Sequence, residues 1–256
     1  MTRSRQQLLH IANEARDAVR FYNHHSHRHF TAWQQVPFVS YNAYVRTPIL
    51  RRVTSYDAIC ISRTYLDGCT MAHGVKVLDR NDLAAEYSLL DRLLKMCRLK
   101  TLKNVLVVSD ADQAYAASEF VRMMCFVAEN VTALCAPDSK NGQSAQPSDV
   151  AFMFGSWTNN HAWLNRCRGR IGFVDVHNAR QLSATYQILT HPIIGWLGIK
   201  PPNANYWRYP VDCYHFERVA GRLVVTSFIN RAQPIVRLTT DVAVNAVNGR
   251  TGRVSV

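Results

Sequence analysis

Apolar runs alternate with segments of helical periodicity through the middle of this chain, and no other feature restricts the possible folds as much. The run Asn104–Val108 is rich in β-branched residues, as expected for a central strand buried on both faces. Asn81–Arg98 and Ala111–Glu129 carry apolar residues at helical spacing. Strands that alternate with helices of this length form parallel β-α-β units. The sequence therefore predicts an α/β fold with a doubly wound, mainly parallel sheet and helices on both of its faces.

The neighbouring segments follow the same alternation. Further strands are predicted at Val75–Leu78, Val131–Cys135, Val150–Phe154, Ile171–Val176 and Ile193–Leu197. The apolar stretch Ala58–Ile61 is interpreted as a short strand or a packed extension. Further helices are predicted at Ala179–Leu189 and Tyr214–Ala232. The polar segment Pro137–Asp149 is the clearest loop.

The two ends of the chain are less regular. The first twenty residues combine a basic and an apolar helix face, which is typical of an organelle-import signal or of a first helix; Glu14 and Asp17 weigh against import. Phe21–Arg52 mixes aromatics, histidines and prolines and is interpreted as an extended arm. The predicted division is an N-terminal helix and arm at 1–73, an α/β domain at 74–232 and a basic C-terminal tail at 233–256.

Charge and cysteine content restrict the class of partner. The 256 residues carry a formal net charge of +12, which favours a polyanionic partner because each neutralised phosphate releases counterions. A basic soluble enzyme is the alternative. Seven cysteines without a CxxC pair are typical of reduced, intracellular thiols. No apolar run approaches the roughly 18 residues of a membrane span, so no membrane partner is predicted.

The turns after the predicted strands carry no catalytic or cofactor motif. Ser109–Asp112 and His177–Ala179 contain neither GxGxxG nor GxxxxGK[ST]. Asp110 and Asp112 would repel a phosphate, and we interpret them as caps of the following helix rather than as metal ligands or acid-base groups. No GxSxG motif occurs. The sequence predicts no catalytic residue and no cofactor.

Two groups of side chains need a separate judgement. His24, His25, His27 and His29 are the best metal candidates, but their spacing matches no standard zinc site, and an arm that lies along RNA is favoured. Cys167 would be a reactive thiol only if exposed, and a buried, inert cysteine is expected. No metal site is predicted.

Several segments resemble a known family in the same order along the chain. Residues 154–164 (FGSWTNNHAWL) resemble a turn and helix start of the ribosomal small-subunit protein S-two family, and 191–232 resemble its strand, loop and closing helix. Residues 72–79 and the strand 105–108 resemble two earlier elements. Only 165–170 separate the first segment from the next strand, so the bacterial-type coiled-coil hairpin is absent. The lysine and the acidic pair of the family motifs are also missing.

The resemblance implies a flavodoxin-like domain without enzymatic activity. It would be a structural constituent of the small ribosomal subunit in translation, holding ribosomal RNA and neighbouring proteins at the head-body junction, with no small-molecule substrate. Long extensions and eroded motifs are typical of a mitochondrial ribosome. Arginines offer bidentate phosphate contacts and an aromatic ring offers a stacking plane, although ordinary core packing is the alternative for the tryptophans. The residues predicted to bind RNA are Arg3, Arg5, Arg28, Arg51, Arg52, Arg166, Arg168, Arg170, Trp157 and Asn159.

Two other functions stay open. An α/β enzyme that uses a nucleotide or a phosphosugar is suggested by the predicted fold, which is an analogy only. A free RNA-binding or RNA-processing factor outside the ribosome would account for the same positive charge.

Overall fold

The fold is described from a computed structural model, which covers residues 5–24, 28–54, 59–62, 65–67, 70–72, 75–97, 102–110, 114–135, 148–154, 167, 169–175, 186–191 and 193–255. The chain divides into two compact units. Unit 1 comprises Met1–Ser62, Val75–Leu89 and Asn205–Val256, and unit 2 comprises Arg63–Gly74 and Leu90–Ala204. These bounds differ from the predicted division at residues 73 and 232, because both ends of the chain belong to unit 1.

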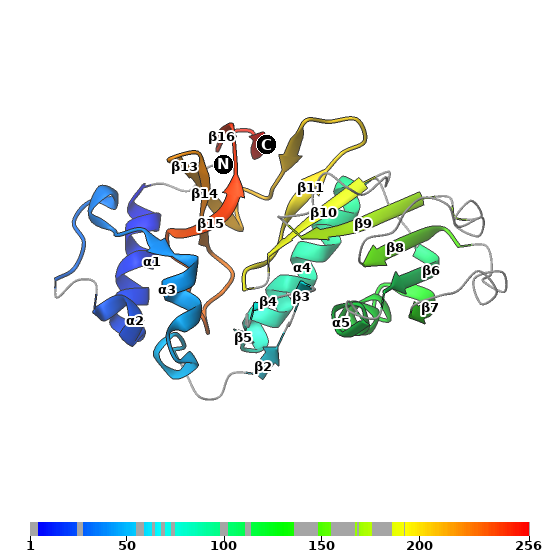
Figure 1. Cartoon of the computed structure of the whole chain (residues 1–256), viewed down its shortest axis with the longest axis horizontal. Helices are drawn as coiled ribbons and strands as arrows, with labels where there is room; N and C mark the ends of the chain where they lie inside the picture. The colour runs from blue at the N-terminus through cyan, green and yellow to red at the C-terminus, as the bar shows by residue number, and fades with distance from the viewer. Residues whose placement is uncertain are drawn as a thin grey trace. The chain divides into compact units, whose positions relative to one another are not determined.

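Unit 2 is built on a mainly parallel sheet (Figure 1). Its strands lie in the order β11-β10-β9-β8-β6-β7. The four neighbouring pairs from β10 to β7 are parallel, and β11 pairs with β10 in the antiparallel sense. The predicted α/β class is therefore confirmed. The strands of this sheet are β6 (Leu102–Ser109), β7 (Ala128–Cys135), β8 (Val150–Phe154), β9 (Gly169–Asp175), β10 (Tyr186–His191) and β11 (Gly195–Lys200).

The order of the parallel strands reverses once. Numbered from β6 along the chain, they lie in the order 2-1-3-4-5, which is the order of flavodoxin-like sheets. The helix α5 (Ala114–Met124) connects β6 to β7 and contacts β6, β7 and β8. The other connections lie largely outside the described residues. Of residues 165–170, where the sequence predicts no hairpin, 167, 169 and 170 are described. The flavodoxin-like arrangement of helices on both faces therefore stays a prediction.

The central strands are buried as their composition predicts. All five residues of β8 are buried, and Val105–Val108 of β6 are at most 1% exposed. The helix before β7 is shorter than predicted, since it ends at Met124 and β7 already begins at Ala128. Val127, predicted to point inward, is 46% exposed. Val127 lies in the turn between α5 and β7, so the helical register that would point it inward no longer applies.

The predicted helix Ala179–Leu189 is wrong in its described part. Residues 179–185 lie outside the described residues, and Tyr186–His191 form β10, which pairs with β9 and β11. Ile188 and Leu189 are buried within this sheet. Neighbouring strands on both sides stabilise the extended conformation, and short apolar runs do not distinguish strand from helix by periodicity alone. Unit 2 also contains the small hairpin of β3 (Tyr65–Asp67) and β4 (Thr70–Ala72).

Unit 1 combines several groups of paired strands with helices. Its four-stranded sheet has the order β1-β15-β14-β13, and the strands β16-β17-β12 and β2-β5 pair in the antiparallel sense. These strands are β1 (Val39–Ser40), β2 (Ile59–Ser62), β5 (Val75–Leu78), β12 (Tyr206–Arg208), β13 (Tyr214–Val219), β14 (Arg222–Ser227), β15 (Leu238–Ala243), β16 (Ala246–Asn248) and β17 (Arg253–Ser255). The helical segments are α1 (Arg5–Ala18), α2 (Arg20–Asn23), η1 (Trp33–Gln35), α3 (Tyr41–Arg46), η2 (Ile49–Arg51) and α4 (Arg80–Met96), whose last residues belong to unit 2.

The predicted closing helix Tyr214–Ala232 is wrong, because this segment forms the hairpin β13–β14. Its two-residue loop is Ala220-Gly221, and both residues have positive φ angles of 48° and 76°. Such a loop matches the twist of antiparallel strands. In β13, Tyr214 and Phe216 are buried at every second position, which is strand periodicity. The apolar residues that fit a helix face also fit a hairpin, and the glycine in the turn decides between them.

The predicted arms are folded parts of unit 1. In the segment 21–52, Phe21, Trp33 and Tyr44 are buried, so it is not an extended arm. The tail from Gln233 is not an extension either: Gln233, Ile235, Val236 and Leu238 are buried, and β15–β17 follow. Both corrections have one physical cause, since aromatic and β-branched side chains from the two ends of the chain share one core. No described helix is both long and apolar enough to cross a membrane.

Candidate ligand-binding sites

The first candidate site is the edge of the unit 2 sheet at which the parallel strands end. Ligands of open α/β sheets bind outside the carboxyl ends of the strands, where the strand order reverses. In unit 2 this point lies between β6 and β8. Ser109 and Phe154 are opposite each other at these ends, and the Asp110 N–H donates to the Phe154 carbonyl at 3.2 Å. The half-buried Asp110 thus follows directly after the buried Ser109.

The described residue directly after β6 is acidic, and the sequence that follows this strand carries no phosphate-binding glycine motif. Asp110 can accept hydrogen bonds from sugar hydroxyls, as an acidic residue does in dinucleotide-binding folds. Its predicted capping role stays a prediction, because Asp112 lies outside the described residues and α5 begins at Ala114. The buried His191 ends β10, which lies two strands from β8 in this sheet. Its Nδ1 accepts from the Ile193 and Ile194 N–H groups at 3.3 and 3.4 Å. His191 therefore shapes the turn after β10.

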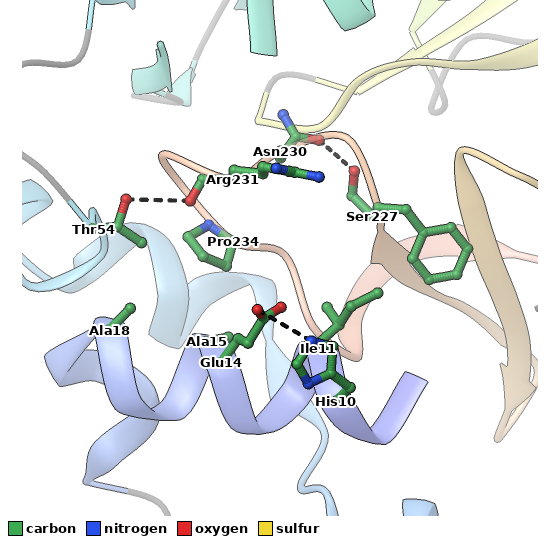
Figure 2. A pocket seen from close by; sticks show the side chains of 11 residues that line it. His10, Ile11, Glu14, Ala15, Ala18, Thr54, Ser227, Asn230, Arg231 and Pro234 are labelled. Carbon is green, nitrogen blue, oxygen red and sulfur yellow. Dashed lines mark hydrogen bonds and ion pairs between the residues drawn. The ribbon is translucent and has the colours of Figure 1, made fainter. Parts of the chain in front are cut away.

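The second candidate site is a pocket in unit 1 with a volume of about 380 Å³. Figure 2 shows α1 on one side of this pocket and the loop after β14 on the other. The helix contributes Glu14 and His10, whose Nε2 lies 3.2 Å from Glu14 Oε1. The loop contributes the exposed Arg231 and the buried Asn230. The remaining lining residues are Ile11, Ala15, Ala18, Thr54, Ser227, Phe228 and Pro234.

A buried carboxylate holds the loop wall of the pocket. Asp82, in the first turn of α4, accepts from the Arg231 N–H at 2.8 Å and from the Ala232 N–H at 2.9 Å. Thr54 donates its N–H to the Ala232 carbonyl at 2.9 Å. Burial raises the pKa of Asp82, while these backbone hydrogen bonds lower it. The main chain at Arg231 is thus fixed, and its side chain remains available to the pocket.

Three buried side chains lie beside the same loop. The Tyr22 and Tyr44 hydroxyls both donate to the Pro234 carbonyl at 3.1 Å. Burial raises the pKa of both tyrosines, so they remain protonated donors. The Arg52 guanidinium carbon lies 5.1 Å from the Tyr44 ring centre, and burial lowers the pKa of Arg52. In the described part of the chain, Arg52 Nε and Nη1 have no hydrogen-bond partner.

A third feature is an arginine-rich face on β12 and β17. Arg208 and Arg253 are directly opposite each other, and both are exposed. Their guanidinium carbons lie 5.9 and 4.6 Å from the Tyr206 ring centre. Like charges at such a position destabilise a strand pair, and among the described residues neither guanidinium has an acidic partner. An anion on this face would relieve the repulsion.

The residues predicted to bind RNA are scattered. Arg5, Arg28 and Arg51 are described and exposed. Arg52 is only 3% exposed, so it cannot reach an RNA from this position, because it packs under Tyr44. Arg170 lies on β9, but its side chain is not described. The others lie outside the described residues: Arg3, Arg166, Arg168, Trp157 and Asn159.

The histidine and cysteine predictions remain largely open. His25 and His27 lie outside the described residues, and His29 Nε2 lies 2.9 Å from Asp17 Oδ2. Within the described ranges no group of three or more His, Cys, Asp or Glu side chains could hold a metal ion. Cys167, expected to be buried, is partly exposed. Sequence reasoning missed the pocket residue Arg231 and the carboxylate of Asp82 that holds its main chain, since only tertiary contacts bring them together.

The comparisons with known proteins bear on the fold. The sequence matches no protein-family model and no curated protein. The structure is similar to the crystal structure of 2-hydroxyisobutyryl-CoA ligase in complex with 2-HIB-AMP and CoA, with a TM-score of 0.61 and 14% sequence identity. The similarity covers 98% of this chain, which spans 66% of the ligase chain. At this identity the similarity shows an α/β fold.

Proposed function

We propose that unit 2 binds a nucleotide, or a carboxylate linked to a nucleotide, at the carboxyl ends of β6 and β8. The observation that carries this proposal is the single reversal of strand order between these two strands, the position at which open α/β sheets bind ligands. The fold similarity to a ligase in complex with 2-HIB-AMP and CoA supports the ligand class. The proposal concerns binding and extends the nucleotide-using alternative drawn from the sequence.

The expected mode of binding follows from the side chains at this edge. The turn after β6 lacks the glycines that allow backbone amides to approach phosphates, and it carries Asp110. A carboxylate favours ribose hydroxyls and disfavours phosphate. The sugar and base therefore anchor the ligand, and adding phosphates brings little affinity. Adenosine and AMP are expected to bind with similar strength.

Calorimetric titration of the full chain with adenosine, AMP, ATP and CoA tests this proposal. Adenosine and AMP should bind, and Asp110→Ala should weaken binding by about tenfold, which is typical of one lost hydrogen bond to a charged group. Asp91→Ala is the matched control, because Asp91 is an exposed carboxylate of α4 that pairs only locally with Lys95 at 2.6 Å. No binding of any of the four compounds, or equal binding by Asp110→Ala, contradicts the proposal.

The ribosomal role predicted from the sequence is the second candidate. The net charge of +12 and the paired arginines at Arg208 and Arg253 favour a polyanion such as RNA. Tyr206 adds a stacking plane for a base. The closing helix no longer supports the resemblance to the ribosomal family, since that segment is the hairpin β13–β14.

Two measurements test the second candidate. Sedimentation of a cell or organelle lysate should place the protein with small-subunit particles. Purified chain should bind single-stranded RNA with an affinity that falls steeply with salt, and Arg208→Gln with Arg253→Gln should weaken binding and reduce the salt slope. Arg20→Gln, an exposed arginine of α2, is the control. Free sedimentation together with no RNA binding would rule this candidate out.

A further inference from the structure

We infer that the pocket between α1 and the loop after β14 binds a small zwitterion, an α-amino acid with an apolar side chain. This inference concerns unit 1 only and does not depend on the nucleotide proposal. It starts from the charges of the two walls. Glu14 lies on the helix side and Arg231 on the loop side (Figure 2). A ligand with both charges complements both walls.

The two charged groups are available to a ligand. Among the described residues the Arg231 guanidinium has no ion-pair or hydrogen-bond partner. Within the described ranges the Glu14 carboxylate contacts His10 through one oxygen, at 3.2 Å. No ion pair joins Glu14 to Arg231 in the described part of the chain. A ligand carboxylate can therefore take the guanidinium in bidentate fashion, and a ligand ammonium can take the free Glu14 oxygen.

The pocket is built before the ligand arrives. Two hydrogen bonds hold the main chain of Arg231. Its N–H donates to Asp82 Oδ1 at 2.8 Å, and its carbonyl accepts from the Thr54 hydroxyl at 3.3 Å. The Ser227 hydroxyl donates to Asn230 Oδ1 at 2.5 Å, which fixes the start of the same loop. Because the main chain of this loop is already held in place, a ligand loses little affinity to ordering it.

Size and lining select the ligand side chain. A volume of about 380 Å³ lies at the lower end of small-molecule sites. The lining includes the polar side chains of Thr54, Ser227 and Asn230 and, beside them, the apolar side chains of Ile11, Ala15, Ala18, Phe228 and Pro234. An amino acid such as leucine places its side chain against these residues. A dissociation constant on the order of 1 mM would correspond to about −0.5 kcal/mol for each non-hydrogen atom of leucine, which is within the range for small ligands.

Titration of the full chain with three related probes tests the inference. L-leucine has both charges, 4-methylpentanoate lacks the ammonium and 3-methylbutylamine lacks the carboxylate. We expect leucine to bind at least about tenfold more tightly than either analogue. Arg231→Gln and Glu14→Gln should each weaken leucine binding by about tenfold.

Controls separate ligand binding from folding. Arg250→Gln removes an exposed arginine outside the pocket lining and should bind leucine like the wild type. The unfolding temperature of Arg231→Gln should stay near that of the wild type, because its main-chain contacts persist. Equal binding of 4-methylpentanoate and leucine, unchanged binding by Arg231→Gln, or no leucine binding up to about 20 mM would overturn the inference.

Discussion

Buried charge distinguishes several individual residues of unit 1. Lys76 on β5 and Glu86 on α4 form an ion pair, with side chains only 0% and 3% exposed. Removal of one partner from such a pair leaves a charge in the interior, whereas removal of both does not. The stability of the contact between β5 and α4 therefore depends on Lys76 and Glu86 together.

We expect Lys76→Met to lower the free energy of unfolding by about 3–5 kcal/mol, because the buried Glu86 carboxylate then loses its ion pair with Lys76. Urea unfolding measures the loss. The double variant Lys76→Met/Glu86→Leu should recover a large part of it, since no buried charge remains. A double variant at least as unstable as the single one would show that volume, rather than charge, dominates at this position.

His215 gives a prediction about pH. Burial lowers the pKa of His215 below 6.5, and Arg237 lowers it further while Glu217 raises it. The folded state therefore binds this proton less readily than the unfolded chain. The contribution of His215 to the free energy of unfolding is fully present above pH 6.5. It is lost progressively as the pH falls below 6.5, until the pH passes the pKa of His215 in the folded state.

The difference between the wild type and His215→Phe isolates this effect. Phenylalanine keeps a ring beside Trp33, whose ring centre lies 5.8 Å from that of His215. Urea unfolding between pH 7.5 and pH 5 should show a smaller loss of stability on acidification for the variant. Parallel curves for the two proteins would contradict the assignment, because the other histidines are the same in both.

At the scale of elements, two tight turns illustrate how glycine permits strand pairing. Gly221 closes the β13–β14 hairpin with a φ of +76°, and a Cβ there meets no atom within 4 Å. Gly252, before β17, has a φ of +63°, and a Cβ there would lie 2.5 Å from the Tyr209 carbonyl oxygen. The Tyr209 N–H also donates to the Gly252 carbonyl at 2.8 Å.

Gly252→Ala should therefore destabilise unit 1 more than Gly221→Ala. The left-handed conformation alone costs about 1–2 kcal/mol for an alanine. At Gly252 the clash adds the loss of a hydrogen bond, about 1 kcal/mol more. Denaturant titrations of both variants measure the difference, and equal losses would indicate that the turn at Gly252 relaxes freely.

The β13–β14 hairpin also marks the limit of periodicity. Its apolar residues satisfy a helix face as well as a two-residue repeat, so pattern reading chose a helix. The positive φ angles at Ala220 and Gly221 and the pairing with β15 settle the structure. In contrast, α4 was predicted within two residues at each end, because its apolar face is long. At the start of this helix the Asp82 N–H donates to Asp79 Oδ1 at 2.7 Å.

At the scale of the whole molecule, the two ends of the chain share the core of unit 1. Tyr22 and Tyr44 bond to Pro234 across more than 180 residues of sequence. The Arg237 guanidinium donates to the Val36 carbonyl at 2.6 Å and pairs with Glu217 at 2.9 Å. These contacts make the first fifty residues a structural requirement for the strands at the end of the chain.

We expect a chain that lacks residues 1–47 to lose the cooperative unfolding of unit 1, because Phe21, Tyr22, Trp33 and Tyr44 leave its core. Limited proteolysis should then cut β13–β15 rapidly. Gln34→Ala and Asn42→Ala, two exposed positions in the same segment, are the controls and should change little. Full protection of β13–β15 in the shortened chain would restore the interpretation of this segment as an arm.

The sequence by itself determined the elements whose signal is local. The β-branched run of β6, the apolar β8 and the long amphipathic helices α1 and α4 follow from neighbouring residues alone. Burial on both faces leaves a continuous apolar run, and burial on one face leaves a periodic pattern. These elements are enough to establish an α/β fold.

Tertiary structure alone decided the rest. The packing of both chain ends into one core, the hairpin in place of a closing helix, the reversal of strand order between β6 and β8 and the convergence of Glu14 with Arg231 all depend on residues far apart in sequence. No local pattern encodes which distant partner a side chain meets, because burial and hydrogen bonding are satisfied equally well by many local conformations until the whole core forms.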